Sequence, residues 1–138
     1  MESNNRGWEL VELAQRTPAE AEEMVNAAHA SALLWSKIGT DVNTARAHLL
    51  LGLVHGLAGD AALALRYAQA SLDYFAVREC PDWEIAFAHA AMACAAHAAG
   101  DQGLHERHYR EAAGQGEAIA DPEDREIFMR TFRQIASV

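Results

Sequence analysis

Histidine is the residue type in this sequence whose chemistry stands out first. The chain of 138 residues contains seven histidines, and imidazole is both a common metal ligand and a proton donor or acceptor near neutral pH. His48 and His89 occupy equivalent positions in two similar segments, so stacked helices could bring them together with His55 in one interior. His105 and His108 are three residues apart, a spacing that permits joint metal ligation from one helix face.

The sequence around these histidines does not complete a recognisable metal site. No Glu precedes them in an E-x-x-H pattern, and no Cys-x-x-Cys accompanies them. A single histidine on an apolar helix is usually a core residue that forms one hydrogen bond with a backbone or side-chain partner. We therefore predict no metal site and no cofactor, with His48, His55 and His89 as the candidate ligands if one exists.

The two cysteines, Cys80 and Cys94, offer nucleophilic chemistry if a base lies beside either of them. Cys94 falls in an alanine-rich segment that is expected to be buried, where a thiol is inert. Cys80 falls in a loop and is more accessible, but nothing in the sequence places a base near it. The pair also lacks the spacing of a metal or redox motif, so no disulfide framework is expected. We predict a protein without catalytic residues.

Two helical hairpins, over about residues 43–78 and 83–119, are predicted to position these side chains. Each hairpin contains the same short turn, at Gly59-Asp60 and at Gly100-Asp101. In each turn the glycine supplies a left-handed helix stop and the aspartate caps the next helix. Asp82 is predicted to cap the helix that opens the second hairpin.

The first helix of each hairpin is predicted to be buried on all sides. Over residues 45–58 almost every side chain is apolar or small, and only Arg46 is charged. Residues 86–99 repeat this character, which is typical of a central helix. Gly52 and Gly56, four residues apart, are expected to let a neighbouring helix approach closely.

Three further helices are predicted to flank the hairpins, over about residues 8–15, 18–38 and 122–136. The clearest start signal is Thr17-Pro18-Ala19-Glu20, in which Thr caps the helix and Glu reaches back to the cap amide. Residues 1–7 are polar and are expected to be frayed. The total is about seven helices, with no strand.

The composition excludes several classes of partner. The net charge is −9, and no Lys or Arg has a basic neighbour, whereas a nucleic-acid-binding surface needs clustered basic residues. No stretch of about 18 residues is apolar enough to span a membrane, and the N-terminus has no hydrophobic leader segment. We expect a cytoplasmic protein that binds neither nucleic acid nor membrane.

An excess of apolar side chains predicts an interaction surface. A solenoid of two hairpins has two open ends and a concave face, and each exposes apolar surface unless something caps it. Large exposed apolar patches mark interfaces. The face expected to stay uncovered carries Leu49, Leu53, Leu57, Phe87, Ala90 and Cys94. It is predicted to be a homodimer seam or a groove for a partner's helix or peptide, unless the N-terminal segments fold over it.

The two hairpins resemble the tetratricopeptide repeat. The first copy carries Leu51-Gly52, Gly59-Asp60, Ala64-Leu65, Tyr67 and Leu72, and the second carries Gly100-Asp101, Tyr109 and Ala112. His48 and His89 stand where the repeat prefers Trp, and the offset of 41 residues, from 59 to 100, exceeds the usual period of about 34. The resemblance implies an all-α fold of antiparallel hairpins stacked as a short right-handed solenoid.

More of the chain resembles a family of short, uncharacterised bacterial proteins. The resemblance rests on residues 29–40 (HASALLWSKIGT) and 119–125 (IADPEDR), and it covers roughly residues 20–135. It implies a tetratricopeptide-like fold and brings no known activity.

Residues 1–138 are thus predicted to form a single helical domain that acts through protein–protein contact without catalysis. We expect it to self-associate, as a homodimer. The alternative is a helical domain that binds a small molecule or a metal ion in an interior lined by His48, His55 and His89. An enzyme with Cys80 as its nucleophile is the third hypothesis. The identity of the partner does not follow from the sequence.

Overall fold

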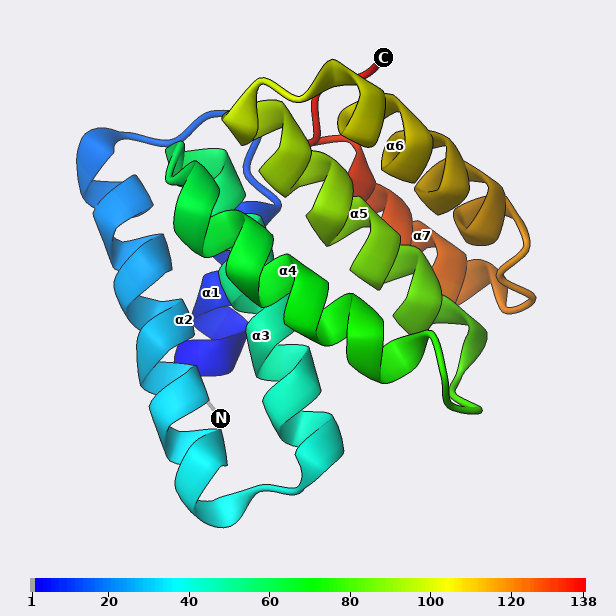
Figure 1. The fold of residues 1–138 in the computed structure, drawn as a ribbon. Helices are drawn as coiled ribbons and strands as arrows, with labels where there is room; N and C mark the ends of the chain where they lie inside the picture. Colours follow the sequence, from blue (N-terminus) through cyan, green and yellow to red (C-terminus); the bar gives the residue numbers. More distant parts are fainter. Residues whose placement is uncertain (1) are drawn as a thin grey trace.

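The computed structural model describes residues 2–138, and its regular structure is helical throughout that range (Figure 1). Its helices are α1 (Glu2–Val11), α2 (Pro18–Ile38), α3 (Asp41–Ala58), α4 (Ala61–Phe75), α5 (Asp82–Ala99), α6 (Gln102–Glu117) and α7 (Pro122–Phe132). These seven helices, with no strand among residues 2–138, confirm the predicted all-α class.

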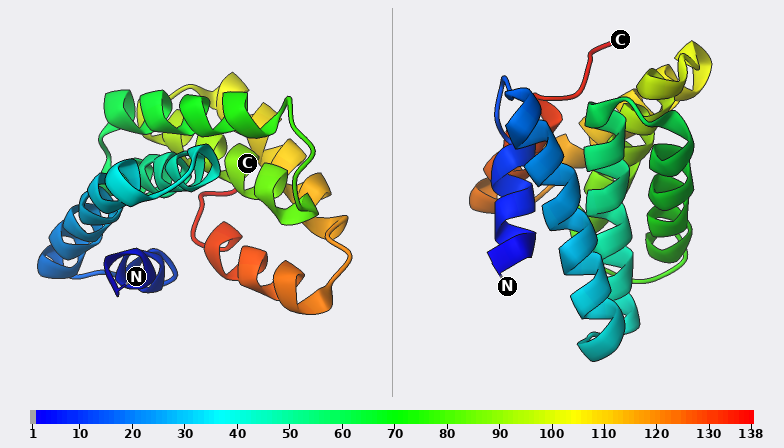
Figure 2. Two further views of the ribbon diagram at one scale, coloured as in Figure 1. Left: turned by 90° about the horizontal axis from the view of Figure 1, so that it is seen from below. Right: turned by 90° about the vertical axis from the view of Figure 1, so that its left-hand side faces the viewer.

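The five central helices form an arch, and the first and last helices both lie on its concave side (Figure 2, left). Along the arch, each helix from α2 to α6 packs against the next, and α3 also contacts α5. On the concave side, α1 contacts α2 and α3, whereas α7 contacts α5 and α6. The two ends of the chain therefore cover the same side of the arch from opposite edges.

The two short turns have the predicted geometry. Gly59 and Gly100 adopt left-handed backbone conformations, with φ of 88° and 73°. Residues other than glycine rarely adopt such conformations. The side chains of Asp60 and Asp101 each accept a hydrogen bond from the backbone N–H three residues later, at 3.3 and 3.1 Å. The same local device therefore ends α3 and α5 and begins α4 and α6.

The N-terminal helix differs from the prediction of a frayed segment followed by a helix over residues 8–15. α1 begins at Glu2, and Met1 lies outside the described residues. Gly7 is buried, and the Arg6 guanidinium donates to both carboxylate oxygens of Glu23 on α2, at 2.9 and 3.0 Å. Contacts with α2 hold this polar stretch in place, and no local pattern encodes them.

The predicted starting signals are confirmed for α2 but not for α5. Thr17 Oγ1 accepts from the N–H of Glu20 at 3.1 Å, and Glu20 Oε1 accepts from the N–H of Thr17 at 2.9 Å. Asp82, predicted to cap α5, is instead its first residue and makes no cap hydrogen bond. Its carboxylate accepts from the N–H of Ala120 at 3.0 Å. It therefore fixes the connection between α6 and α7.

Gly52 and Gly56 allow the close helix approach that their spacing predicts. A Cβ on Gly52 would lie 2.9 Å from the backbone nitrogen of Ala68 on α4. A Cβ on Gly56 would lie 2.7 Å from Sγ of Cys94 on α5. Both distances are far below ordinary carbon contacts of about 3.5–4.0 Å. Helices α4 and α5 therefore both pack closely against the backbone of α3.

We predict that Gly52→Ala lowers the free energy of unfolding by about 1–3 kcal/mol, because overpacking against a backbone atom forces the helices apart. Gly114→Ala is the matched control, since Gly114 is an exposed helical residue and a Cβ added there would have no neighbour within 4 Å. The Gly114→Ala change should raise the free energy of unfolding by about 0.5–1 kcal/mol, because alanine has the higher helix propensity. Urea denaturation of both variants measures the difference, and equal shifts would contradict the close approach of α3 and α4.

Candidate functional site

The apolar face expected to stay uncovered is largely covered within one chain. Leu53 and Ala90 have no exposed surface, Leu49 and Cys94 are each 4% exposed, and Phe87 is 7% exposed. Leu57 is half-buried. The expectation of an open face at these residues is therefore wrong, which leaves them little surface for a partner.

Aromatic side chains from the two ends of the chain cover Phe87 in this face. The ring of Trp8 on α1 packs edge to face on Phe87, with 5.4 Å between centroids. Phe128 on α7 packs on the same ring at 5.1 Å. Phe87 is thus held between the two helices that lie inside the arch.

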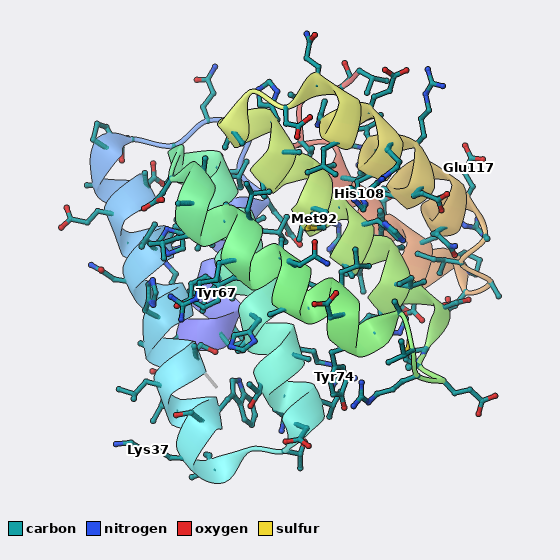
Figure 3. The ribbon with its side chains drawn as sticks, in the orientation of Figure 1. Lys37, Tyr67, Tyr74, Met92, His108 and Glu117 are labelled. Atoms are coloured by element: carbon teal, nitrogen blue, oxygen red, sulfur yellow. The ribbon has the colours of Figure 1, made fainter. Side chains whose placement is uncertain are left out.

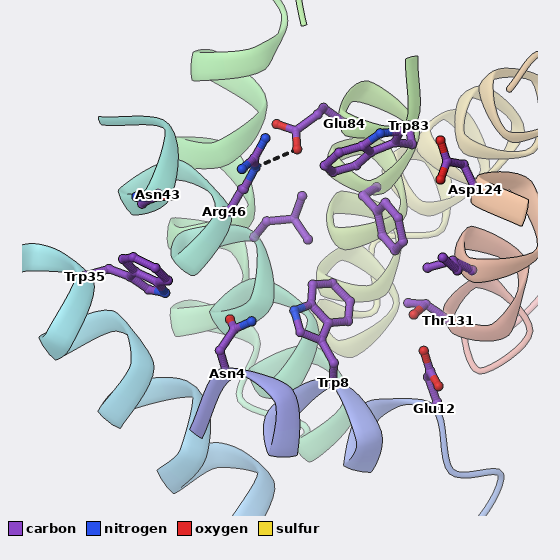
Figure 4. Close-up of a pocket in the computed structure, with 13 residues that line it drawn as sticks. Asn4, Trp8, Glu12, Trp35, Asn43, Arg46, Trp83, Glu84, Asp124 and Thr131 are labelled. Carbon is purple, nitrogen blue, oxygen red and sulfur yellow. Dashed lines mark hydrogen bonds and ion pairs between the residues drawn. The ribbon is translucent and has the colours of Figure 1, made fainter. Parts of the chain in front are cut away.

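A pocket of about 590 Å³ remains on the concave side, between these same helices (Figure 4). Helices α1, α2, α3, α5 and α7 all contribute to its lining. The lining residues are Asn4, Trp8, Glu12, Trp35, Asn43, Arg46, Leu49, Trp83, Glu84, Phe87, Asp124, Ile127 and Thr131. We call this site the tryptophan pocket.

All three tryptophans of the chain line this pocket. Trp8 comes from α1, Trp35 from α2 and Trp83 from α5, and each is half-buried. Figure 4 shows their rings around one space, with Leu49 and Phe87 among the apolar residues of the lining. Three helices that are distant in the sequence therefore present large, partly exposed aromatic surfaces to one site.

An ion pair lies in the wall of the tryptophan pocket. Nε of Arg46 on α3 donates to Oε1 of Glu84 on α5 at 2.7 Å. The side chain of Glu84 is 1% exposed, whereas that of Arg46 is 44% exposed. The guanidinium carbon of Arg46 also lies 5.3 Å from the ring centroid of Trp83. Arg46 is thus held by a carboxylate and an aromatic face at once.

Burial of Glu84 and its pairing with Arg46 shift the pKa of its carboxyl in opposite directions. Burial raises the pKa of this carboxyl, and the hydrogen bond and positive charge of Arg46 partly offset the rise. Desolvation is the larger effect because an ionised carboxylate loses its hydration inside the fold. Arg46 therefore favours the ionised form of Glu84 against the cost of its burial.

Two buried polar atoms of the pocket residues have no hydrogen-bond partner in the protein. They are Oε2 of Glu84 and Oγ1 of Thr131, and Thr131 is 1% exposed. Buried polar atoms are nearly always hydrogen-bonded. Glu12 and Asp124 add two more carboxylates to the lining, so three acidic side chains face one basic side chain, Arg46.

The histidine candidates are divided among different partners. Nε2 of His55 lies 2.8 Å from Nε2 of His29, and Nδ1 of His89 lies 2.9 Å from Nδ1 of His108. His48 packs on the ring of Tyr67, labelled in Figure 3, with 5.5 Å between centroids. His55 also stacks on the ring of Tyr67, with 6.1 Å between centroids. His48 and His55 thus share one environment, whereas His89 lies in another with His108.

No group of three His, Cys, Asp or Glu side chains among residues 2–138 is arranged to hold a metal ion. His105 and His108 share a helix but point to different partners. His105 Nδ1 donates to the backbone carbonyl of Ala93 at 2.8 Å, whereas His108 reaches His89. Their spacing therefore serves packing of α6 on α5.

The hydrogen bonds of His108 define its protonation. Arg107 Nη2 donates to Nε2 of His108 at 3.2 Å, so Nε2 carries no proton. The proton of the neutral ring is then on Nδ1 and is donated to Nδ1 of His89. Burial, together with the positive charges of His89 and Arg107, lowers the pKa of His108 to about 4. The ring of His108 is therefore neutral at pH 7.

Neither cysteine has the environment of a nucleophile. Burial raises the pKa of the Cys94 thiol to about 12. Burial and the negative charge of Glu84 raise the pKa of the Cys80 thiol. Sγ of Cys80 lies 4.0 Å from the carbonyl of Phe75, and Sγ of Cys94 lies 3.8 Å from the carbonyl of Leu53. Both thiols are therefore protonated at neutral pH and face backbone oxygens.

Comparisons of the chain with protein-family models, with curated proteins and with solved structures found no match. The resemblances described above therefore stay predictions. Among residues 2–138, no helix combines the length and the apolar character needed to cross a membrane. What the chain binds must be inferred from the geometry of the tryptophan pocket.

Sequence reasoning did not identify the tryptophan pocket as a site. Trp8 and Trp35 each fit the inward stripe of an amphipathic helix, a pattern that indicates packing and not a binding site. One local signal was present: Arg46 is the only charged residue in an otherwise apolar helix segment, and a charge on such a helix requires a partner. That partner, Glu84, is 38 residues away.

Proposed function

We propose that this protein is a non-catalytic helical domain that binds a segment of a partner protein in the tryptophan pocket. The observation that carries the proposal is the convergence of all three tryptophans on one pocket. Ligand pockets are typically about 300–1,000 Å³ in volume, mostly apolar, with a few convergent polar groups. Tryptophan is also enriched among the residues that dominate binding energy at protein interfaces.

The proposed architecture is a short right-handed solenoid in which α3–α4 and α5–α6 are stacked antiparallel hairpins of the tetratricopeptide type. The equivalent turns at Gly59-Asp60 and Gly100-Asp101 support two copies of one unit. Solenoids of this kind present an extended concave surface to their ligands. The tryptophan pocket is lined in part by α1 and α7, the two helices that lie on the concave side of the arch (Figure 2).

The absence of catalysis in this proposal is supported by the state of the reactive side chains. The thiols of Cys80 and Cys94 have raised pKa values, and a nucleophilic cysteine requires a lowered one. The buried imidazoles of His55 and His108 are used in hydrogen bonds to other histidines. None of these groups lines the tryptophan pocket.

Site-specific photo-crosslinking tests the proposal. Ile127 lines the pocket and is 41% exposed, and Val77, outside the pocket, is 78% exposed. A benzophenone amino acid is placed at each position in turn, and a lysate of the source organism is irradiated. We expect a discrete protein adduct from position 127 and none of the same mass from position 77.

Trp35→Ala provides the specificity control, because Trp35 lines the pocket but belongs to neither cluster of core residues. This change should abolish the adduct at position 127 while leaving the helical circular dichroism unchanged. An adduct of twice the mass of the chain would identify the partner as a second copy, as the predicted homodimer requires. Identical adducts from both positions, or none from position 127, would overturn the proposal.

A further inference from the structure

The tryptophan pocket has the charge of a site for a cation. Its lining contains the carboxylates of Glu12, Glu84 and Asp124 and one guanidinium, that of Arg46. The carboxylate of Glu84 is already shared with Arg46, and its Oε2 has no partner. Glu12 and Asp124 have no paired cation among the side chains that line the pocket. An incoming positive charge therefore finds two uncompensated carboxylates and a buried acceptor.

The uncompensated carboxylates gather on the side of the pocket formed by α1 and α7. Figure 4 shows Asp124, Thr131 and Glu12 along this side, with Arg46 across the pocket. The ring of Trp8 lies nearest to Glu12 and Thr131, whereas Asp124 lies nearest to Trp83. The hydroxyl of Thr131 is buried without a partner. A cation placed next to Trp8 would thus meet negative charge, a free hydroxyl oxygen and an aromatic ring.

Arg46 shows what kind of cation such walls hold. Its guanidinium lies over the ring of Trp83, 5.3 Å from the centroid, while Nε donates to Glu84. A planar guanidinium can stack on an aromatic face and still direct its N–H groups to a carboxylate in the same plane, which a spherical ammonium cannot do. The wall formed by Trp8, Glu12 and Asp124 offers the same two kinds of contact with no resident cation.

We propose that the tryptophan pocket recognises an arginine side chain presented by a segment of a partner protein. The guanidinium lies beside Trp8, between the carboxylates of Glu12 and Asp124, on the opposite side of the pocket from Arg46. This inference rests on the proposed function and specifies its ligand.

A protein segment, rather than a free small cation, fits the rest of the lining. Asn4 and Asn43 lie at the edge of the pocket nearest Trp35 (Figure 4). Their amides both donate and accept hydrogen bonds, as a peptide backbone requires. Trp35 offers an apolar surface to residues that flank the arginine. A free guanidinium would leave this half of the pocket unused.

Tryptophan fluorescence measures binding directly, because all three tryptophans line the site. The probes are capped pentapeptides of glycine and serine with a central arginine, citrulline, lysine or glutamate. Citrulline keeps the shape of arginine and removes its charge. We expect the arginine peptide to bind at least about tenfold more tightly than the citrulline peptide, since both a carboxylate contact and cation–π attraction are lost. The affinity for the lysine peptide should lie between those for the arginine and citrulline peptides.

The double variant Glu12→Gln, Asp124→Asn tests the position of the cation. It should lower the affinity for the arginine peptide by at least about fivefold and leave the affinity for the citrulline peptide unchanged. Glu117→Gln, an exposed carboxylate on α6 outside the pocket, is the matched control and should change neither affinity.

Three results would overturn the inference. Equal affinity for arginine and citrulline peptides would show that charge is not recognised. An unchanged preference in the double variant would place the cation elsewhere. Agmatine, a free guanidinium compound, binding as tightly as the arginine peptide would identify a small-molecule site. If the photo-crosslinked adduct at position 127 still forms in any of these cases, partner binding stands and only the ligand assignment fails.

Discussion

Replacing Arg46 with alanine is expected to lower the free energy of unfolding by about 2–4 kcal/mol at pH 7. The change removes the charge that faces Glu84, whose side chain is 1% exposed. Breaking a buried ion pair from one side typically costs about 3–5 kcal/mol. The lower range applies here because the side chain of Arg46 is 44% exposed, and because Glu84 can bind a proton in place of its partner.

The loss should depend on pH in a defined direction. The pKa of Glu84 is raised by burial, so above the ordinary glutamate value of 4.5 the unfolded chain loses this proton while the folded chain retains it. Stability therefore falls as pH rises from about 4.5 through the folded pKa. Removing Arg46 takes away the influence that lowers this pKa. The difference between Arg46→Ala and the native protein should thus be smallest near pH 4.5 and largest at pH 7–8.

Urea denaturation at a series of pH values measures this effect. The control is Arg66→Ala, because the Arg66 guanidinium also lies 5.3 Å from an aromatic centroid, that of Tyr67, but pairs with no buried carboxylate. It should lower stability by less than about 1 kcal/mol. The double variant Arg46→Ala, Glu84→Gln should lose the added pH dependence. An Arg46→Ala effect that is the same at pH 4.5 and pH 8 would show that Glu84 is not the group responsible.

The local features of this fold could be predicted from the sequence because short-range chemistry determines them. The left-handed glycines at 59 and 100 and the capping box at Thr17 follow from residue types a few positions apart. The close approach at Gly52 follows from an apolar helix with a missing side chain. Each of these can be read within one helix or one turn.

The tryptophan pocket could not be predicted in this way, because its residues come from five helices. The pattern around Trp8 predicts that the residue faces inward, but not that α1 packs inside the arch against Phe87. Residues 2–7 are polar, so their helix depends on contacts with α2 such as the pair of Arg6 with Glu23. The two terminal helices that lie on the concave side pack on Phe87 of the predicted interface and contribute to the lining of the pocket.

The histidines show the same limit on what the sequence can predict. The equivalence of His48 and His89 in the two hairpins suggested one shared interior. Their partners, however, lie within their own hairpins. His48 packs on Tyr67 of α4 and His89 reaches His108 of α6, and these two partners are related by the same offset of 41 residues, from 67 to 108. Each histidine therefore contacts the second helix of its own hairpin, and the two do not share one interior.

The second large effect expected is a loss of folding stability on acidification from pH 6.5 to pH 4.5, caused by His108. The pKa of His108 is lowered to about 4, whereas an unfolded histidine has a pKa of about 6.5. Between these values the unfolded state binds a proton that the folded state does not. The stability due to the neutral ring is therefore complete above pH 6.5 and is lost as pH falls toward 4. The full loss is about 3 kcal/mol, and most of it occurs before carboxylates with pKa values below 4.5, such as Glu23, begin to titrate.

His108→Gln separates this contribution from all others. The glutamine amide can donate to Nδ1 of His89 as the neutral imidazole does, and it does not titrate. Between pH 6.5 and 4.5 the variant should lose about 2 kcal/mol less stability than the native protein. Thermal unfolding across this range, together with an NMR titration of the imidazole of His108, measures both quantities. Equal pH dependence in the two proteins, or a His108 imidazole that titrates near 6.5 in the folded state, would show that burial on α5 does not keep the ring neutral. The pair would then join α5 to α6 by packing alone.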